Sequence, residues 1–203
     1  MKKIKIKKQK KEKSKKWLTR HFNDLYYQEA RRKGFRSRSA FKLIQINEKY
    51  KIFFKNAKIL DLGSAPGGWS QVAKKLCGFS STVIGIDRLE IMPLDGVNFV
   101  RGDLNDLSIR NKISEFFPSG ADIILSDMAP NTTGHHETDH IRITGLVELA
   151  LEISNLYLNR NGFFICKIFQ GGAQGELLES VKYTIKNVKY FKPDASRKES
   201  SET

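Results

Sequence analysis

One short stretch limits the fold more than any other part of the chain: residues 61–70, which read Asp-Leu-Gly-Ser-Ala-Pro-Gly-Gly-Trp-Ser. An apolar run typical of a strand, residues 57–60, leads into it, and a helical stretch, residues 71–76, follows it. A strand that ends in an acid, turns through glycines and opens a helix is how α/β proteins present a cofactor at the carboxyl edge of a sheet. The stretch therefore predicts an α/β fold with a ligand site at this turn.

From Ala57 onward, short β-branched runs alternate with segments of helical length. This alternation predicts a doubly wound, mostly parallel sheet. The predicted strands are residues 57–62, 82–87, 97–100, 121–126, 161–168 and 188–191, and the predicted helices are residues 68–77, 105–117, 139–159 and 174–187. The run Phe163–Cys166 is apolar at every position, which favours a central strand covered on both faces.

The positive charge is concentrated at one end of the chain. Residues 1–42 hold 17 Lys and Arg and three acids, whereas residues 43–203 hold 19 of each sign. Residues 1–16 are predicted to be a disordered basic tail, because a lysine-rich run repels itself and cannot build a core. Residues 17–203 are predicted to form one domain that begins with a basic helical extension over residues 17–50.

Two helices are predicted within this extension. The first lies between residues 17 and 34 and breaks at Gly34, and the second starts at Ser37 or Ser39 and ends near Tyr50.

Cations in the extension are interleaved with aromatic residues. The cations are Arg20, Arg31, Arg32, Lys33, Arg36 and Arg38, and the aromatic residues are Trp17, Phe22, Tyr26, Tyr27 and Phe35. Cations suit phosphates and rings suit bases, so the mixture favours nucleic acid over a membrane surface; a purely solvated tail is the alternative for residues 1–16. No apolar run reaches the roughly 18–20 residues of a membrane span. Cys77 and Cys166 match no metal or disulfide spacing, which favours a reducing, cytoplasmic location.

Three acids end three consecutive predicted strands: Asp61, Asp87 and Asp103. The turn after Asp61 lacks the glycine spacing of a dinucleotide fingerprint, and an acid there suits a cationic amine or sulfonium, both of which S-adenosylmethionine carries. Asp87 can accept hydrogen bonds from a ribose diol, and Asp103 can meet an adenine amino group. For a lone acid at such a position, helix capping is the alternative.

Three motifs together make the sequence resemble one family. Residues 61–70, residues 126–131 (Ser-Asp-Met-Ala-Pro-Asn) and residues 166–171 (Cys-Lys-Ile-Phe-Gln-Gly) are similar to the FtsJ/RrmJ family of S-adenosylmethionine-dependent RNA 2′-O-ribose methyltransferases. Residues 36–43 and 192–197 fit the same pattern. The resemblance runs from about Trp17 to the last residue and is nearest to the bacterial branch, which methylates a uridine of large-subunit (23S) ribosomal RNA.

The resemblance implies a Rossmann-like methyltransferase fold, S-adenosylmethionine as methyl donor with no metal, and ribosomal RNA within the large ribosomal subunit as partner. It also implies a monomer that needs no membrane. A final antiparallel edge strand should follow the active-site glutamate, but the sequence stops at Thr203 before it, which would leave Glu202 on a frayed end.

The resemblance further implies a Lys-Asp-Lys-Glu active-site set. Its members fall on Lys42, Asp127, Lys167 and Glu202, where the spacing from residues 192–194 selects Glu202 over Glu199. The implied cofactor-binding residues are Asp61, Gly63, Gly67, Gly68, Trp69, Asp87, Asp103 and Asp127.

The chemistry of these side chains suits a ribose acceptor. A ribose hydroxyl is a poor nucleophile near neutral pH, so a site must orient it and accept its proton. Lys167 can accept that proton only in its neutral form, which burial and the nearby Lys42 both favour. Asp127 can hold the lysine and the hydroxyl in line with the methyl group, and positioning then supplies much of the rate.

Other functions suit the residues less well. A nicotinamide-dependent oxidoreductase would share the fold and Asp87 but lacks its glycine fingerprint, and a non-catalytic RNA-binding module would need no intact active-site set. Methylation of a base amino group favours an aromatic residue that Asp127–Pro130 lacks, and methylation of a pyrimidine carbon needs a thiol, whereas strand alternation turns Cys166 away from Lys167. Transfer RNA and messenger caps remain alternative targets. The histidines of residues 134–140 are interpreted as part of a flexible loop facing the substrate, not as a metal site.

Overall fold

A parallel sheet forms the centre of the fold in the computed structural model, which describes residues 24–130, 136–168, 185–197, 200 and 202–203. Its strands are β1 (Lys58–Leu62), β2 (Thr82–Asp87), β3 (Val97–Arg101), β4 (Ala121–Ser126) and β5 (Leu158–Cys166). They lie in the order β3-β2-β1-β4-β5, and every neighbouring pair is parallel. The strand order reverses between β1 and β4, so ligands are expected at the carboxyl ends of these two strands.

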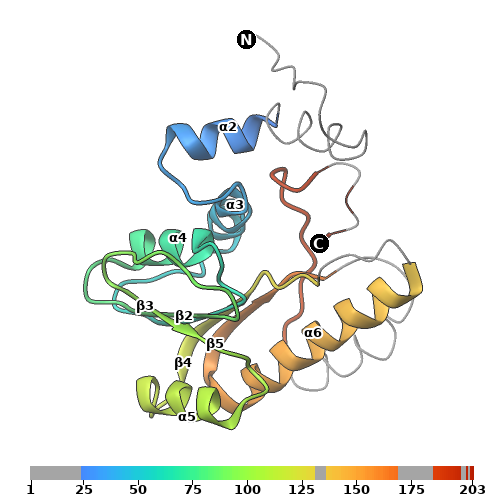
Figure 1. The fold of residues 1–203 in the computed structure, drawn as a ribbon. Helices are drawn as coiled ribbons and strands as arrows, with labels where there is room; N and C mark the ends of the chain where they lie inside the picture. Colours follow the sequence, from blue (N-terminus) through green and yellow to red (C-terminus); the bar gives the residue numbers. More distant parts are fainter. Residues whose placement is uncertain (1–23, 131–135, 169–184, 198–199, 201) are drawn as a thin grey trace.

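Helices cover both faces of this sheet. Helices α3 (Ala40–Tyr50) and α4 (Gly68–Cys77) lie on one face, and α5 (Leu107–Phe116) and α6 (His136–Tyr157) lie on the other (Figure 1). Helix α2 (Leu25–Arg32) lies outside α3. The predicted doubly wound α/β architecture is confirmed.

Alternation along the strands divides the core between the two faces. On β1, Ile59 packs toward α3 and α4, and Leu60 packs toward α5 and α6; both side chains are fully buried. Successive residues of a strand point to opposite faces, so an apolar run such as Ile59–Leu60 serves both layers. Full burial of each such side chain stabilises the fold by about 1.5–3 kcal/mol relative to exposure.

The first four predicted strands agree with the structure within one residue at each end, but the last two predictions need correction. Residues 188–191 do not form a strand; there the Phe191 ring packs edge-on against Tyr50 of α3, with 5.8 Å between the ring centroids. Strand β5 is not central: it lies at the edge of the sheet in the described part of the chain, and Phe163 is 40 % exposed. An apolar run looks the same whether it packs against a strand or lines a cavity, as Phe163 does here.

The predicted helices agree with α4, α5 and α6, whose ends differ by up to three residues from the prediction. Most of the predicted helix over residues 174–187 lies outside the described residues, and residues 185–187 are not helical.

The described residues of the extension form two helices, as predicted, with the break at Gly34, whose φ is +72°. Asp24 caps α2 by accepting hydrogen bonds from the backbone N–H groups of Tyr26 and Tyr27 at 3.0 and 3.2 Å. Ser39 stands at the N-cap position of α3 without a side-chain capping bond. The predicted tail, residues 1–16, lies outside the described residues.

The end of the chain returns to the sheet. Ile168 and Thr203 exchange both backbone hydrogen bonds, at 2.9 and 2.8 Å, which is an antiparallel pairing just beyond β5. Thr203 is therefore paired, and the expectation of a frayed end at Glu202 is wrong. Within the described ranges, no helix is long and apolar enough to cross a membrane.

Candidate active site

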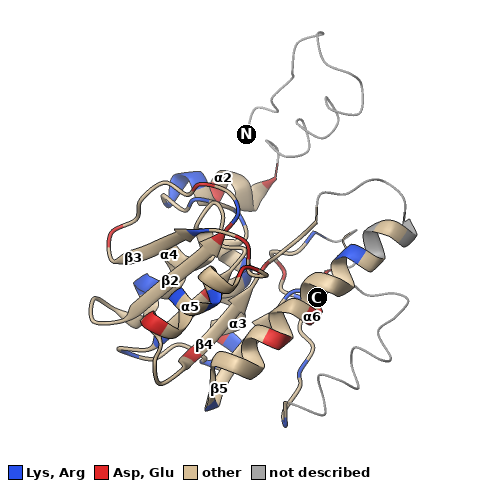
Figure 2. Cartoon of the chain, turned by 60° about the horizontal axis from the view of Figure 1, so that its bottom comes forward, with Lys and Arg blue, Asp and Glu red and all other residues tan. Residues whose placement is uncertain are grey.

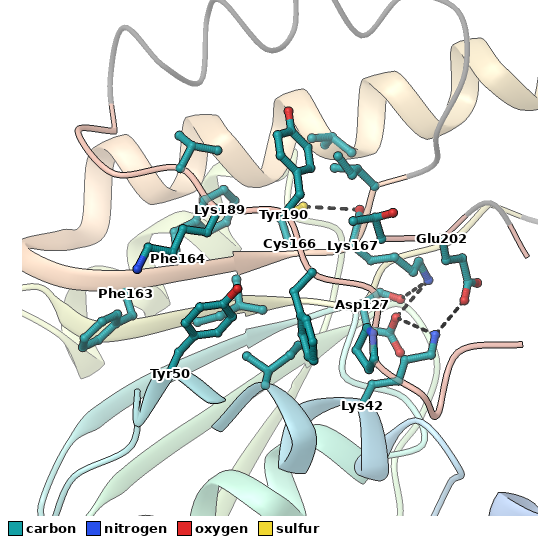
Figure 3. Close-up of a pocket in the computed structure, with 18 of the residues that line it drawn as sticks. Lys42, Tyr50, Asp127, Phe163, Phe164, Cys166, Lys167, Lys189, Tyr190 and Glu202 are labelled. Carbon is teal, nitrogen blue, oxygen red and sulfur yellow. Dashed lines mark hydrogen bonds and ion pairs between the residues drawn. The ribbon is translucent and has the colours of Figure 1, made fainter. Parts of the chain in front are cut away.

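Four charged side chains from distant parts of the sequence meet at the carboxyl ends of β4 and β5 (Figure 3). Lys42 comes from the first turn of α3, and Glu202 comes from the end of the chain. Asp127 and Lys167 directly follow Ser126 and Cys166, which are register partners in neighbouring parallel strands. We call Lys42, Asp127, Lys167 and Glu202 the charged cluster. The structure thus brings together all four residues predicted for the active site.

Charges of opposite sign alternate through the charged cluster. Nζ of Lys167 lies 3.0 Å from Oδ1 of Asp127 and donates a hydrogen bond to the Asp127 carbonyl at 2.8 Å. Nζ of Lys42 lies 2.8 Å from Oε2 of Glu202 and 4.0 Å from Oδ1 of Asp127. The side-chain exposures run from 8 % for Lys167 to 23 % for Glu202, so water screens these pairs less than it screens surface pairs.

The carboxylate of Glu202 is stabilised in its ionised form. Burial acts to raise the pKa of Glu202, but the ammonium groups of Lys42 and Lys167 and a hydrogen bond from Ser200 outweigh burial, so the pKa is lowered overall. Glu202 therefore stands as an anion beside Lys42 near neutral pH.

Two residues of the extension hold the C-terminal segment that carries Glu202. Arg38 donates hydrogen bonds to the carboxylate of Asp24 and to the carbonyl of Ala195. Gln45 of α3 accepts a hydrogen bond from the backbone N–H of Ala195 at 2.9 Å. Composition suggested a phosphate contact for Arg38, and no local pattern in the sequence signals its bond to Ala195, 157 residues away.

Two aromatic residues of the extension also have partners within the protein. The rings of Tyr26 and Phe35 pack on Phe41, with centroids 5.4 and 5.5 Å apart, so both are part of a small apolar cluster of the extension. Trp17 and Phe22 lie outside the described residues.

A cavity of about 550 Å³ opens beside the charged cluster (Figure 3). All four members of the cluster line it, and the remaining wall is mostly apolar, with Tyr50, Phe163 and Tyr190 among its residues. Of the predicted cofactor-binding residues, Trp69 and Asp127 line this cavity, whereas the glycines of the turn, Asp87 and Asp103 do not. The turn after β1 is therefore a separate part of the site.

That turn, Gly63–Gly67, is shaped by backbone requirements, and we call it the β1–α4 turn. Gly63 and Gly67 have φ values of +68° and +101°, which L side chains rarely adopt. A Cβ on Gly63 would lie 2.4 Å from Cγ of Met128, so only glycine lets the turn approach the segment after β4 this closely. Gly68 then begins α4, whose first N–H groups are free of helical partners.

Asp61 lies beneath the β1–α4 turn and is 1 % exposed. Its Oδ2 accepts a hydrogen bond from Oγ of Ser70 at 2.5 Å. Burial raises the pKa of Asp61 to about 7, although the bond from Ser70 acts to lower it. In the described part of the chain, Oδ1 of Asp61 and Oγ of Ser64 are buried without a hydrogen-bond partner. Two such acceptors suit a ligand with amine and hydroxyl donors, and S-adenosylmethionine has both.

The acids after β2 and β3 already have partners within the protein. Asp87 accepts hydrogen bonds from the N–H groups of Ala65 and Leu89 at 2.9 and 2.8 Å, which ties the end of β2 to the β1–α4 turn. Asp103 accepts bonds from Asn105 and pairs with Arg88, and these contacts lower its pKa, with the backbone bond from Asn105 the largest cause. Asp103 thus forms a turn before α5, and it is not the helix cap that was its alternative, because Asp106 stands at the N-cap position of α5.

Trp69, which lines the cavity, also has a partner within the protein. This side chain of α4 is buried in the core that α3 and α4 share, and its Nε1 donates a hydrogen bond to the Ser39 carbonyl at 2.9 Å. Trp69 therefore joins the start of α3 to the start of α4, the helix that opens after the β1–α4 turn.

Two predictions about reactive groups can be compared with the structure. Burial raises the pKa of the Cys166 thiol to about 12, which does not suit a thiolate nucleophile. The interpretation of residues 134–140 as a loop is wrong from His136 onward, because α6 begins there. No group of three or more potential metal ligands occurs among the residues that the structure describes.

Comparisons with known proteins agree with this geometry. Residues 35–203 match the family described as FtsJ-like methyltransferase. Curated relatives called ribosomal RNA large subunit methyltransferase E include proteins from Acidiphilium cryptum (50 % identical over 93 % of this chain and 83 % of the relative) and Rickettsia akari (51 % over 92 % and 84 %). The crystal structure of a Plasmodium falciparum protein described as a ribosomal RNA methyltransferase matches with a TM-score of 0.72 and 31 % identity, over 78 % of this chain and 91 % of that one.

Proposed function

Because the chain belongs to the FtsJ-like methyltransferase family, we propose that it transfers the methyl group of S-adenosylmethionine to the ribose 2′-hydroxyl of a uridine in large-subunit (23S) ribosomal RNA. The observation that carries the proposal is the charged cluster next to the β1–α4 turn. Two lysines and two carboxylates at one sheet edge can orient a hydroxyl and manage its proton. The names of the relatives support ribosomal RNA of the large subunit as the substrate.

The proposed reaction uses the residues at the ends of β4 and β5. When bound, S-adenosylmethionine supplies a methyl group on a sulfonium, whose carbon–sulfur bond breaks as the oxygen–carbon bond forms. Asp127 orients the ribose hydroxyl, and Nζ of Lys167, 3.0 Å from Oδ1 of Asp127, receives the hydroxyl proton while it is neutral. Orientation of the hydroxyl supplies a further part of the rate, since an intramolecular geometry replaces a random encounter.

Lys42 and Glu202 complete the charge balance around this pair. The ammonium of Lys42 lies 4.0 Å from Oδ1 of Asp127, where it competes with Lys167 for that carboxylate. Glu202 neutralises Lys42 through the 2.8 Å ion pair. We assign both residues to positioning and electrostatic support, not to contact with the transferred methyl group.

The RNA is proposed to bind along the basic extension. Arg31, Arg32 and Lys33 are exposed at the C-terminal end of α2, and Figure 2 shows this end of the helix in blue. Since each phosphate contact releases counterions, we expect binding to weaken steeply with salt. Replacing the ten lysines of residues 1–16 by glutamine should flatten the salt dependence, and an unchanged slope would contradict a role for the tail.

The direct test maps 2′-O-methyl groups after the purified chain has acted on unmethylated large-subunit RNA, supplied both as free RNA and as assembled subunits. One new 2′-O-methyluridine, present with the wild-type chain and absent with Lys167→Ala, is the expected result. Methylation of a base, or of transfer RNA or a messenger cap in place of ribosomal RNA, would contradict the proposal. We expect the reaction in the cytoplasm, where large subunits are assembled.

A further inference from the structure

The guanidinium of Arg36 lies between two loops at the carboxyl edge of the sheet. Its Nη1 donates hydrogen bonds to the carbonyls of Met92 at 2.6 Å and Pro66 at 3.3 Å, and its Nη2 donates to the carbonyl of Pro93 at 2.5 Å. Pro66 belongs to the β1–α4 turn, whereas Met92 and Pro93 belong to the loop between β2 and β3, which we call the β2–β3 loop. One side chain of the extension therefore joins both loops.

The backbone around Arg36 is held in register with α4. The N–H of Arg36 donates a hydrogen bond to Oε1 of Gln71 at 3.0 Å, and Nε2 of Gln71 donates to the Gly34 carbonyl at 2.8 Å. This paired contact fixes the point from which the Arg36 side chain departs. The guanidinium also lies over the ring of Phe99 on β3, 5.7 Å from its centroid.

The sequence of the turn accommodates this guanidinium. A Cβ on Gly67 would lie 3.0 Å from Nη1 of Arg36 and 3.1 Å from Cζ of Phe99, closer than nearly all real Cβ contacts. Glycine at position 67 therefore serves the approach of Arg36 as well as the positive φ of the turn.

These contacts indicate a role for Arg36 other than the phosphate binding that its basic neighbours suggest. A guanidinium is planar and presents several N–H donors at fixed angles. In Arg36 the two terminal nitrogens already donate to three backbone carbonyls, so this side chain is not an open phosphate contact. The two loops that it joins also flank Asp87, whose carboxylate accepts bonds from Ala65 in one segment and Leu89 at the start of the other.

We propose that Arg36 is a positioning residue that fixes the β1–α4 turn against the β2–β3 loop and thereby shapes the binding site for S-adenosylmethionine. The inference rests on the proposed function for the identity of the ligand. It assigns Arg36 to the cofactor side of the site, whereas the interleaved charges of the extension had suggested RNA.

The test compares the full-length chain with Arg36→Met, Arg36→Lys and Lys74→Met. Lys74 is the matched control, because its ammonium also donates to two loop carbonyls, those of Phe79 and Ser81 at 2.9 and 2.7 Å, around the far end of α4. Its side chain passes the β2–β3 loop at Gly96, but it has no hydrogen bond to Met92, Pro93 or the β1–α4 turn in the described part of the chain. The Kd for S-adenosylmethionine is measured by calorimetry, the Kd for RNA by filter binding, and backbone amide exchange by mass spectrometry.

Arg36→Met should raise the Kd for S-adenosylmethionine about tenfold, because several charge-assisted hydrogen bonds between the loops are lost. Arg36→Lys should fall between Arg36→Met and the wild type, since one ammonium cannot reproduce the fork. Amide exchange should rise in residues 63–68 and 88–96 and not in β4. Lys74→Met should lower the melting temperature and leave the Kd for S-adenosylmethionine unchanged.

Equal loss of S-adenosylmethionine affinity in Arg36→Met and Lys74→Met would overturn the inference, because a general loss of stability would then explain both. So would a loss of RNA affinity alone in Arg36→Met, which would return the residue to phosphate contact. A wild-type chain that binds S-adenosylmethionine but methylates no RNA would refute the proposed function, and the comparison of cofactor affinities would still decide the role of Arg36.

Discussion

The charged cluster and the β1–α4 turn lie at the same sheet edge but are built in opposite ways. The cluster consists of four side chains that come from four distant segments and meet through ion pairs of 2.8 to 4.0 Å. The turn is one continuous stretch whose shape comes from glycines, a buried acid and backbone hydrogen bonds. The charged cluster is defined by the charges of its side chains, and the β1–α4 turn is defined by the conformation of its backbone.

This difference predicts how each region responds to substitution. Removing a charge from the cluster leaves the backbone in place, so the chemical step should slow while cofactor affinity is kept. Adding or removing atoms at the turn shifts the backbone, so affinity and stability should fall together. The quantities to measure are kcat, the Kd for S-adenosylmethionine and the free energy of unfolding. If substitutions in the cluster and in the turn alter the same quantities, the two regions do not differ in the way described.

The largest effect is expected for Lys167. Lys167→Ala should lower kcat about 10³-fold, because the hydroxyl loses its proton acceptor. The Kd for S-adenosylmethionine should stay within about twofold of wild type, as expected for a group that acts mainly in the transition state. Single-turnover methyl transfer and calorimetry measure the two quantities.

Lys167→Arg separates proton transfer from positioning. An arginine keeps the positive charge next to Asp127 but cannot give up its proton near neutral pH. If Lys167 accepts the proton, Lys167→Arg should be as slow as Lys167→Ala. Recovery of most of the rate by arginine would mean that the charge alone is needed, and the assignment of the proton to Nζ would be wrong.

The next effect concerns Asp61 and depends on pH. The raised pKa of about 7 means that the folded chain keeps this proton between pH 4 and 7, whereas the unfolded chain releases it near 3.8. The contribution of Asp61 to stability is therefore full at low pH and is lost as the pH rises toward 7. Between pH 5 and 6 the wild type should lose about 1.4 kcal/mol per pH unit relative to Asp61→Asn, which cannot titrate, and the slope should fall to about half of that near pH 7. Equal slopes in chemical denaturation would contradict this.

The same titration sharpens the interpretation of the β1–α4 turn. A cationic ligand group near Oδ1 of Asp61 binds better when the carboxylate is ionised. The affinity for S-adenosylmethionine should therefore rise as the pH increases through about 7 in the wild type and stay flat in Asp61→Asn. A flat wild-type profile would place the cation elsewhere.

Gly63→Ala tests the backbone of the turn. The new Cβ would meet Cγ of Met128 at 2.4 Å in a conformation with φ of +68°, so both strain and a clash follow. We expect a loss of about 2–3 kcal/mol in stability and a weaker affinity for S-adenosylmethionine.

Gly34→Ala is the matched control: its φ is +72°, but nothing lies within 4 Å of the added Cβ. It should lose only about 1 kcal/mol and keep its affinity, and equal affinity losses in both variants would mean that the clash is unimportant.

The two regions also differ in how far the sequence predicted them. The β1–α4 turn could be read directly, because strand, acid, glycines and helix follow one another from Asp61 to Ser70 and local patterns encode local structure. The four cluster residues came from motif resemblance, since nothing in local pattern joins Lys42 to Glu202. Their distances and ion pairs needed the structure.

Several side chains of the extension also have partners within the protein that composition did not reveal. Tyr26 and Phe35 looked suited to bases but pack on Phe41, and Arg36 and Arg38 looked suited to phosphates but bind backbone carbonyls. Composition shows the chemical type of each side chain. Only the tertiary structure shows whether its hydrogen-bond donors or its aromatic ring already contact other parts of the protein.

The smallest effect is expected at the outer member of the cluster. Glu202→Gln keeps the shape of the side chain but removes the charge that pairs with Lys42 at 2.8 Å. Lys42 would then turn more fully toward Asp127, 4.0 Å away, and misplace that carboxylate. We expect kcat to fall about tenfold with an unchanged Kd for S-adenosylmethionine, because the catalytic groups are still present but one of them is misplaced.

Glu199→Gln is the matched control, because Glu199 is the other acid that could follow the Ser-Arg element. A tenfold loss of kcat in Glu199→Gln with none in Glu202→Gln would assign the active-site role to Glu199 in place of Glu202. A loss of affinity for S-adenosylmethionine in Glu202→Gln would mean that the charged cluster and the β1–α4 turn do not have separate effects.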